Sequence, residues 1–494
     1  MAKQIMSSSN LLFFSLTLLI ITLSPIPIFA SASLEEANAL LKWKASLEIP
    51  KNSLLSSWIP LPLNSSASAP CTSWFGVVCN ADGSIQKLNL TSSGLKGTLH
   101  RFSFSLLHNL TRFNLSINNF FGPIPPEIRH LSKLVYLDFS FNKFSGVIPP
   151  EIGNLHQLNI LHLYSTNISC SIPSSLGDLT LLNILYLYKN QLSGSIPTEL
   201  ANLKSLTHLE VAYNQLSGSI PSSLGDLTSL NVLYCGSIPS SSGDLASLNV
   251  LYLWKNQLSG PIPIELGNLK SLTNLDFLTD LEVADNQLSG PIPSSLDKPQ
   301  QHTMTDPRCE LGKVKSITDF KVNNNPISGS IPLDFGNSTQ LQRLDLSSNH
   351  LVGEIPREFG KMKILDLSKN RLNGSIPTTI GQWAQIHYLN LNNNKLNEKI
   401  PSEIGKLVHL TELDLSQNSL TKEISSEVQS LQSLIKLDLY HNRPSGSISD
   451  AFTHLPRRIE INLSYNELSG PVPLWVNFVN VSIESNPDLC GNAT

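Results

Sequence analysis

The sequence predicts an α/β solenoid, with a concave parallel β-sheet, an irregular or 3-10 convex side and a helical N-terminal cap. Three observations carry this prediction. A template rich in Leu and Asn recurs along the chain, most of its steps are 24 residues long, and Gly and Pro return at the same place in the unit. Self-similarity at such a period is typical of solenoids, in which each unit packs only on its neighbours.

The template is L-x-x-L-x-L-x-x-N-x-L-x-G-x-I-P, and residues 185–197 show its second half clearly. Ser93 and Thr166 hold the Asn slot in two weaker units. With one degenerate unit around Cys235, we count about 16 coils over residues 83–485. The slot itself is filled by Asn118, Asn142, Asn190, Asn214, Asn256, Asn286, Asn325, Asn349, Asn370, Asn394, Asn418, Asn442 and Asn466.

Each template position has a physical reason. The L-x-L alternation forms a short strand with inward leucines, and stacked coils align these strands into one parallel sheet on the order of 75 Å long. The Asn amide both donates and accepts, so it satisfies turn backbone that would otherwise be buried without a partner. Gly permits a turn conformation that is costly for other residues, and Pro suits an outer segment with few ladder bonds. A helical bundle is excluded because Gly and Pro recur throughout.

The repeat is irregular near 230–240, 270–285 and 297–312. The unit around Cys235 lacks six residues, including the Asn, while the other two stretches carry six and fifteen extra residues. Insertions of this kind are either functional loops on one face or products of repeat decay. We expect the Cys235 coil to bulge without breaking the solenoid, because its neighbours still stack.

Residues 1–30 are predicted to be a secretory signal peptide. Lys3 provides positive charge, an apolar run covers residues 11–21, and small residues at Ala30 and Ala32 offer a cleavage site. The run is short for a membrane span, and two prolines follow it. The chain as written is therefore expected in the apoplast, and at the plasma membrane only if a longer form has a transmembrane helix.

Cysteines and sequons agree with secretion. Cys71 and Cys79 are close in sequence and are expected to form a disulfide, whereas the pairing of Cys170, Cys235, Cys309 and Cys490 stays open. A repeat rich in Asn and Ser also creates sequons by chance. We expect glycosylation at Asn64, Asn89, Asn109, Asn114, Asn167, Asn337, Asn373, Asn462 and Asn480.

Several function classes are disfavoured. The net charge is -4 without clustered Lys and Arg, so no nucleic-acid partner is expected. Residues 334–336 spell Asp-Phe-Gly, as in kinases, but no other kinase motif accompanies them. The sequence also lacks a P-loop, H-E-x-x-H and G-x-S-x-G, and its cysteines lack metal-ligand spacing. We predict a protein that is not an enzyme and has no cofactor or metal.

Function is expected on the concave sheet, where alternate strand residues point outward from a rigid backbone. These positions lie two, four and six residues before the Asn slot. Aromatic residues gather there between about 160 and 255, and such side chains are enriched at binding hot spots, although strands also favour them. The hypothesis is a groove for an extended peptide, formed by His162, Tyr164, Tyr186, Tyr188, His208, Glu210, Tyr252 and Trp254.

The repeats resemble the extracellular leucine-rich repeats of plant receptor kinases and receptor-like proteins, of which the L-x-G-x-I-P half is typical. Residues 33–82 resemble the family's N-terminal cap, with an amphipathic helix in Glu35–Leu47 and the Cys71–Cys79 segment. The resemblance implies a right-handed superhelix, a secreted peptide or protein ligand, and a co-receptor kinase with leucine-rich repeats near the C-terminal coils. The Arg-x-Arg pair with which some members grip a peptide carboxylate is absent.

Residues 486–494 resemble the beginning of the family's C-terminal cap, without its second cysteine, transmembrane helix and kinase. We therefore interpret the chain as a receptor ectodomain truncated before those parts. Two alternatives stay open. One is a secreted inhibitor of a pathogen's wall-degrading enzyme, similar to polygalacturonase inhibitors, and the other is the product of a decayed receptor gene.

Overall fold

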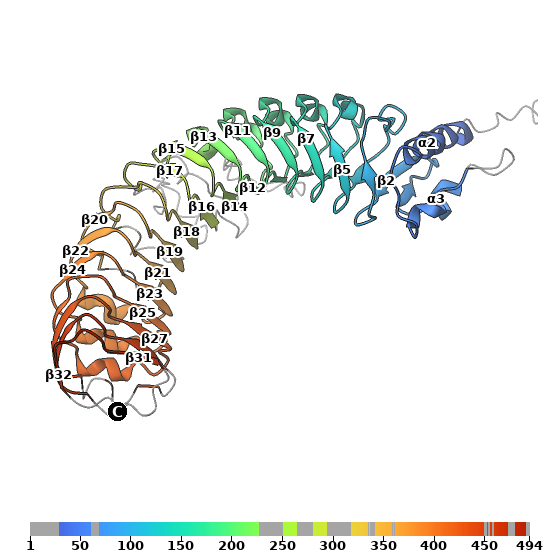
Figure 1. The fold of residues 1–494 in the computed structure, drawn as a ribbon. Coiled ribbons are helices and arrows are strands. Elements are labelled where there is room, and N and C mark those ends of the chain that lie inside the picture. Colours follow the sequence, from blue (N-terminus) through green and yellow to red (C-terminus); the bar gives the residue numbers. More distant parts are fainter. Residues whose placement is uncertain are drawn as a thin grey trace, which may run out of the picture.

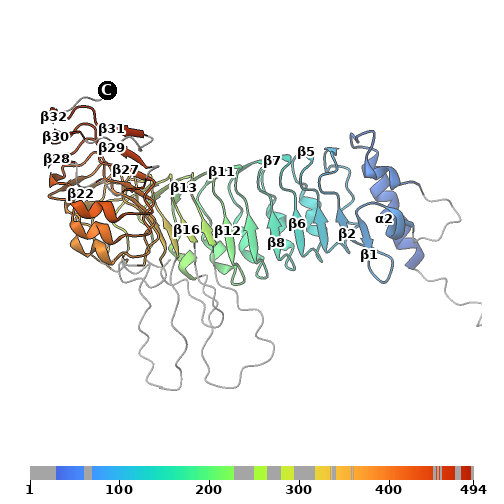
Figure 2. The same ribbon diagram turned by 90° about the horizontal axis from the view of Figure 1, so that it is seen from below.

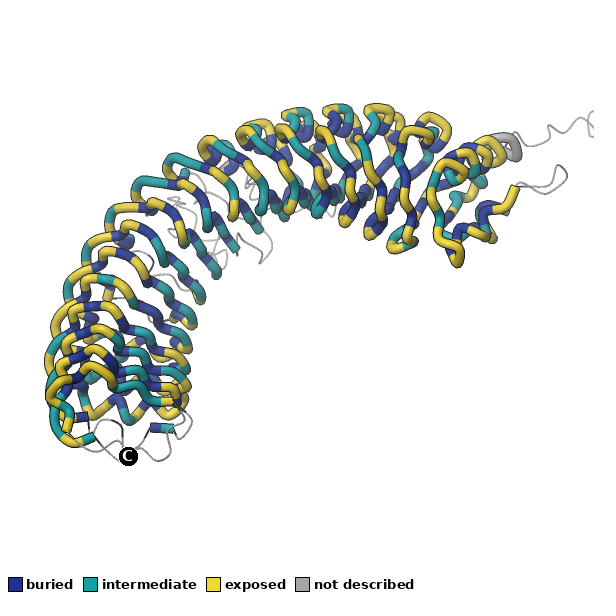
Figure 3. The backbone as a smooth tube through the Cα atoms, viewed as in Figure 1, coloured by how far each residue is buried: buried dark blue, intermediate teal, exposed yellow. Residues whose placement is uncertain are grey.

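Successive repeats stack into an arc in the computed structural model of the chain (Figure 1). The strands of the main sheet line the inner side of this arc, and the N-terminal cap closes one end. Buried residues recur at the same places in each coil (Figure 3). The structure describes residues 29–60, 69–226, 250–263, 280–293, 318–333, 341–357, 361–448, 459–472 and 480–490, and the single residues 335, 359, 452, 455 and 456.

The predicted concave sheet is confirmed, and it contains 17 strands. The first, β1 (Val77–Cys79), pairs antiparallel with the second, and the others pair in parallel in register. The parallel strands are β2 (Ile85–Asn89), β4 (Arg112–Asn114), β6 (Tyr136–Asp138), β8 (Ile160–His162), β10 (Ile184–Tyr186), β12 (His208–Glu210), β14 (Val250–Tyr252), β16 (Asp280–Glu282), β18 (Asp319–Lys321), β19 (Arg343–Asp345), β21 (Ile364–Asp366), β23 (Tyr388–Asn390), β25 (Glu412–Asp414), β27 (Lys436–Asp438), β29 (Glu460–Asn462) and β31 (Asn480–Ser482).

A second row of short strands follows the Asn slot, where the sequence indicated only an irregular segment. It forms sheets of eight, three and four strands, which lie beside the main sheet in Figure 2. These strands are β3 (Lys96–Gly97), β5 (Asn119–Gly122), β7 (Lys143–Gly146), β9 (Asn167–Cys170), β11 (Gln191–Gly194), β13 (Gln215–Ser219), β15 (Gln257–Gly260), β17 (Gln287–Leu288), β20 (Val352–Gly353), β22 (Arg371–Ser375), β24 (Lys395–Asn397), β26 (Thr421–Glu423), β28 (Arg443–Gly446), β30 (Glu467–Pro471) and β32 (Asp488–Cys490).

Short 3-10 helices form the outer side, as the Ile-Pro segments indicated. Most begin directly after the template Pro, whose fixed φ suits the first turn. They are η2 (Pro126–His130), η3 (Pro150–Asn154), η4 (Ser174–Asp178), η5 (Thr198–Asn202), η6 (Ser222–Asp226), η9 (Thr378–Gln382), η10 (Ser402–Lys406) and η11 (Ser426–Ser430).

The template asparagines form a buried ladder. Asn418 is typical: its Nδ2 donates to the carbonyl oxygens of Leu391, Leu415 and Ser416 at 3.0, 3.1 and 3.0 Å. Its Oδ1 accepts from the Leu396 N–H at 3.0 Å. Asn486 makes the same bonds one coil beyond the last predicted rung, although the sequence analysis placed it in the C-terminal cap.

The residue just before each ladder position has a left-handed backbone. We call these the rim residues; their φ angles lie between 50° and 58°. Such a conformation costs a side chain about 1 kcal/mol, and the ladder bonds that follow offset this cost. The rim residues are Ser92, Ile117, Phe141, Ser165, Lys189, Tyr213, Lys255, Asp285, Asn324, Ser348, Lys369, Asn393, Gln417, His441, Tyr465 and Ser485.

The N-terminal cap covers the open end of the first coils. It contains α2 (Phe29–Lys44), η1 (Leu54–Ser57) and α3 (Ala69–Ser73). The helix begins earlier than the predicted Glu35, and residues 1–28 of the predicted signal peptide lie outside the described residues. The Cys71–Cys79 disulfide is present, and Trp58 stacks on Trp74 at 5.2 Å between ring centroids.

The sheet passes through the irregular regions without interruption. β12 pairs directly with β14, since His208 lies opposite Val250 and Glu210 opposite Tyr252. The expected coil around Cys235 falls in residues 227–249, which lie outside the described residues. β14, β16 and β18 also pair in succession. In the part of the chain that the structure describes, no helix has both the length and the apolar character needed to span a membrane.

Candidate ligand-binding face

The eight predicted residues are all half-buried on or directly after concave strands. His162, Tyr186, Glu210 and Tyr252 occupy equivalent positions on consecutive strands, so their side chains share one row of the sheet. Tyr164, Tyr188 and Trp254 follow two residues later in their coils. His208 lies in a neighbouring row between Ile184 and Val250, and its Nδ1 is 2.8 Å from the Thr207 Oγ1.

Four of these rings form an aromatic cluster, which consists of His162, Tyr164, Tyr186 and Tyr188. His162 stacks on Tyr186 at 5.0 Å with an interplanar angle of 7°, and Tyr164 stacks on Tyr188 at 4.4 Å with an angle of 12°. Edge contacts of 6.2 Å between Tyr164 and Tyr186 and 6.1 Å between Tyr186 and Tyr188 join the two stacks. Each ring supports its neighbours, so the cluster presents a rigid apolar surface.

The N-terminal side of the cluster is fixed by polar contacts. The Nδ1 of His162 lies 3.6 Å from Asp138 Oδ2, and the Tyr136 hydroxyl donates to the same oxygen at 3.0 Å. Burial raises the pKa of Asp138, but hydrogen bonds from His162 and Ser140 outweigh it and hold the pKa below its ordinary value. Arg112 lies over the ring of Tyr136 at 3.8 Å.

A second aromatic patch lies one coil further. It pairs Trp254 with the rim residue Tyr213, whose ring centroids are 4.5 Å apart at 61°. Glu210 separates this patch from the cluster. Burial, together with the nearby carboxylate of Glu282, raises the pKa of Glu210 to about 7, while Lys189 acts in the opposite direction. An acid that is neutral for much of the time suits an aromatic surface.

The sequence analysis did not predict that rim residues contribute to this face. Phe141 extends the cluster toward the N-terminus, with its ring centroid 5.2 Å from that of Tyr164. Phe141 and Ile117 are 49% and 52% exposed. The repeat frame treated the position before the Asn as a turn, so its side chains were not considered. Aromatic residues at the position before the Asn were the sequence signal that could have revealed this contribution.

Charged and other polar side chains are frequent on the C-terminal half of the concave face, where Tyr388 and Tyr440 also lie. Lys321 pairs with Glu282, and the Arg343 Nε lies 3.4 Å from Asp319 Oδ1. Asp345 and similar acids accept a hydrogen bond from the Ser N–H two residues later, at 3.0 Å in this coil. These carboxylates close their own turns, so the pattern is structural.

Sequons mark the two ends of the concave sheet. Among the described sites, Asn89, Asn167, Asn373 and Asn480 are exposed, and Asn109 and Asn462 are partly buried. Asn114 is buried, and its Oδ1 accepts from the Ser116 N–H at 2.8 Å, so its amide is poorly placed for a glycan. Asn64 and Asn337 lie outside the described residues. On the concave strands from β6 to β27 no sequon occurs, and the aromatic residues lie in this interval; Asn167 and Asn373 lie on β9 and β22 of the second row.

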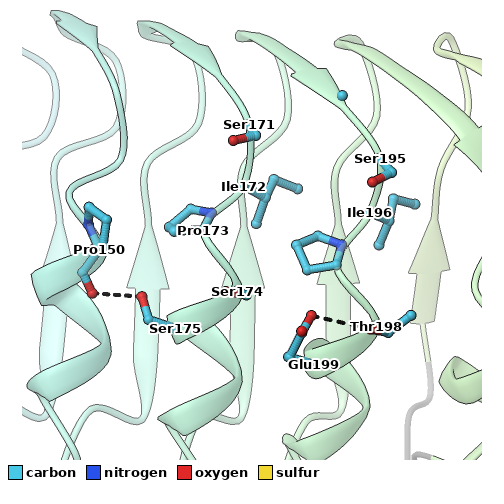
Figure 4. A pocket seen from close by; sticks show the side chains of 12 residues that line it. Pro150, Ser171, Ile172, Pro173, Ser174, Ser175, Ser195, Ile196, Thr198 and Glu199 are labelled. Atoms are coloured by element: carbon cyan, nitrogen blue, oxygen red, sulfur yellow. Dashed lines mark hydrogen bonds between the residues drawn. The ribbon is translucent and has the colours of Figure 1, made fainter.

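Among the described residues, neither the two cysteines outside the disulfide nor the outer pocket offers a site. Cys170 and Cys490 are free and exposed, while Cys235 and Cys309 lie outside the described residues. A shallow pocket of about 710 Å³ lies where consecutive Ile-Pro segments meet (Figure 4). Ser175 Oγ donates to the Pro150 carbonyl there at 2.7 Å. The pocket repeats the template, and the described residues contain no group of His, Cys, Asp or Glu suited to a metal.

We expect stability to depend on pH through Glu210. Its pKa is raised from about 4.5 to about 7 by folding, so this contribution to stability is complete below pH 4.5 and is lost as the pH rises through 7. Glu210→Gln removes the carboxyl whose ionisation destabilises the fold. The variant should therefore stabilise β12 by roughly 1 kcal/mol at pH 8, after allowance for solvent screening, and should have no such effect at pH 4.5. Hydrogen exchange of the β12 segment at both pH values measures this. The exposed Glu412→Gln is the control, and an identical pH response in both variants would contradict the assignment.

Comparisons with known proteins agree with the geometry. A model described as "Leucine rich repeat N-terminal domain" matches residues 33–80. Models of the leucine-rich repeat match residues 360–420 and residues 109–131, 133–155, 181–203, 205–227, 247–269 and 340–362. A probable leucine-rich repeat receptor-like protein kinase of Arabidopsis thaliana is 46% identical over 121 residues, which cover 24% of this chain and 10% of that protein.

Two solved structures are similar over most of the chain. The structure titled "Crystal structure of PEPR1-AtPEP1" has a TM-score of 0.75 and 32% identity, and the match covers 91% of this chain and 57% of that one. The "Plant peptide hormone receptor RGFR1 in complex with RGF2" has a TM-score of 0.59 and 30% identity, and the match covers 84% of this chain and 70% of that one. The present chain thus spans little more than half of the PEPR1 chain.

Proposed function

Because the chain belongs to the leucine-rich-repeat family of plant receptor-kinase ectodomains, we propose that it binds a secreted peptide across the concave strands β8 to β14. The observation that carries this proposal is the pair of stacks, His162 on Tyr186 and Tyr164 on Tyr188. The role is one of binding, without catalysis, and it is extracellular. A co-receptor kinase near the C-terminal coils is a further part of the same proposal.

The physical case rests on preorganisation. Stacked rings lose little conformational entropy when a ligand arrives, and they offer broad apolar contact beside polar hydroxyls. Such rings are costly on a surface that binds nothing, because exposed apolar patches promote aggregation. An extended peptide suits a surface that is long, rigid and curved. The similar structure of RGFR1, a plant peptide hormone receptor in complex with RGF2, supports a peptide as the ligand.

The test uses a library of random linear dodecapeptides displayed against the purified chain, followed by affinity measurement for the selected binders. The combined variant Tyr186→Ala, Tyr188→Ala and Trp254→Ala should weaken binding about 100-fold, since each buried aromatic contact is worth about 1 kcal/mol or more. Tyr440→Ala with Tyr465→Ala removes an edge-to-face pair of rings from distant coils and should leave affinity unchanged.

Unchanged affinity in the triple variant would refute the groove. A library that yields no binder would instead favour the alternatives, an inhibitor of a wall-degrading enzyme or a decayed receptor. Circular dichroism of each variant shows whether the coils stay folded.

A further inference from the structure

Two tyrosines of the aromatic cluster lie face to face. Tyr164 and Tyr188 occupy the same position in consecutive coils, and the Ser165 N–H donates to the Tyr188 carbonyl at 2.9 Å, so their backbones run side by side. Their ring centroids are 4.4 Å apart and the ring planes differ by 12°. Both side chains are half-buried. The stack therefore brings the hydroxyl-bearing edges of two phenol rings close together at the protein surface.

The other ring contacts between tyrosines, in the part of the chain that the structure describes, are edge-on. Tyr186 lies 6.2 Å from Tyr164 and 6.1 Å from Tyr188, at interplanar angles of 74° and 67°. Tyr440 and Tyr465 are 5.3 Å apart at 72°. In an edge-on pair, the edge of one ring points at the face of the other, so only one ring offers the carbon beside its hydroxyl to the contact. The geometry thus distinguishes Tyr164 and Tyr188 from these pairs.

Face-to-face phenols are suited to oxidative coupling. Burial, followed by the nearby Tyr164 and Glu210, raises the pKa of Tyr188, so this phenol keeps its proton at neutral pH and loses it together with the electron. Two adjacent phenoxyl radicals then form one carbon–carbon bond between the ring carbons beside their oxygens. Each of these carbons releases its hydrogen as a proton, and each phenolic oxygen takes one up. The net change is the loss of one hydrogen atom from each tyrosine.

We propose that Tyr164 and Tyr188 are an oxidative modification site, where hydrogen peroxide acting through a haem peroxidase links the two rings as dityrosine. Both phenols are oxidised, one peroxide is reduced to two waters, and no other reactant is needed. The rings turn about χ2 to bring their edges together, and this torsion is broad in tyrosine. The new bond ties the coil of β8 to the coil of β10 across the aromatic cluster. The inference does not depend on what the concave face binds.

The test treats the purified chain with one equivalent of hydrogen peroxide and a catalytic amount of haem peroxidase, at a protein concentration that keeps the chain monomeric. The monomer should gain the fluorescence of dityrosine and lose the mass of two hydrogen atoms. Proteolysis before Asp178 separates Tyr164 from Tyr188 in the untreated chain. A fragment pair that stays joined after this cleavage, detected by mass spectrometry, locates the bond.

Two conservative variants assign the bond to its residues. Tyr188→Phe keeps the stacked ring but removes the phenol, and it should lose the joined fragments. Tyr186→Phe is the matched control, because it removes a phenol that meets both rings edge-on, and it should keep them. Circular dichroism shows that both variants stay folded. Joined fragments that persist in Tyr188→Phe, dityrosine confined to dimers, or no dityrosine in the unaltered chain would each overturn the site. Peptide affinity does not enter this readout, so its result is separate from that of the proposed function.

Discussion

Replacing Asn418 with Ala is expected to destabilise its coil by about 3 kcal/mol. The carbonyls of Leu391 and Leu415 each keep a second donor, Asn394 Nδ2 at 3.1 Å and Asn442 Nδ2 at 2.9 Å. The Leu396 N–H instead loses the Oδ1 to which it donates at 3.0 Å. One orphaned buried donor costs about 1–3 kcal/mol, and the weakened carbonyl bonds add to this.

Hydrogen exchange along the chain is the suitable measurement, because a solenoid does not unfold in one step and a global midpoint would average the effect. Protection should fall in β24 and β25 and stay unchanged in β4 to β8. The control is Gln417→Ala, which alters the adjacent rim side chain and leaves the ladder intact. Equal loss of protection in both variants would show that the ladder bonds are not the cause.

The periodic part of the fold could be predicted because every coil repeats the same arrangement of buried and outward positions. A position that must be Leu or Asn in one coil must be so in the next, and the inward residues such as Leu185 and Leu209 are fully buried as the frame required. The same repetition placed the outward aromatic residues on one face. The resemblance to known repeats then added the cap, and the closeness of Cys71 and Cys79 in the sequence had already indicated its disulfide.

The rim could not be read from alternation, because a left-handed residue ends the alternation. At such a residue the chain turns, and the side chain emerges at the border of the face. Residues such as Phe141 and Tyr213 were therefore missed, although they contact predicted residues. The template Gly position also has a positive φ, but Gly does not always fill it. Cys170, Glu398 and Lys422 occupy this position with φ angles of 65°, 61° and 69°. The local conformation is thus set by the stacked coils and only partly by the residue.

The pairing of β12 with β14 could not be predicted from the sequence either. The degenerate unit around Cys235 lacks its Asn, and a coil without this residue would leave ladder groups of its neighbours without partners. Asn256 instead donates to the Val211 carbonyl at 3.1 Å and accepts from the Leu216 N–H at 3.1 Å, so it continues the ladder from Asn214. Counting motifs along the chain does not show which strand pairs with β12.

Replacing Trp43 with Ala should destabilise the N-terminal cap by about 4 kcal/mol, the largest effect that we expect from a single substitution. The indole is fully buried, stacks on Phe120 at 5.8 Å and meets Phe102 edge-on at 5.0 Å. Its Nε1 donates to the Thr98 carbonyl at 3.0 Å. Truncation of a buried Trp leaves a cavity and costs about 3–5 kcal/mol. Loss of exchange protection in α2 and β3 measures the effect.

Trp43→Phe is a milder change, since it keeps an aromatic ring against Phe120 and removes the donor to Thr98 together with part of the buried indole. It should cost about 1.5 kcal/mol. Lys42→Ala, on the exposed side of the same helix, controls for helix propensity and should have little effect. If the cap only shields the first coil, protection in Trp43→Ala should fall near β2 and recover within a few coils, because each coil contacts only its neighbours. Loss of protection as far as the aromatic cluster would mean that the cap also supports the binding face.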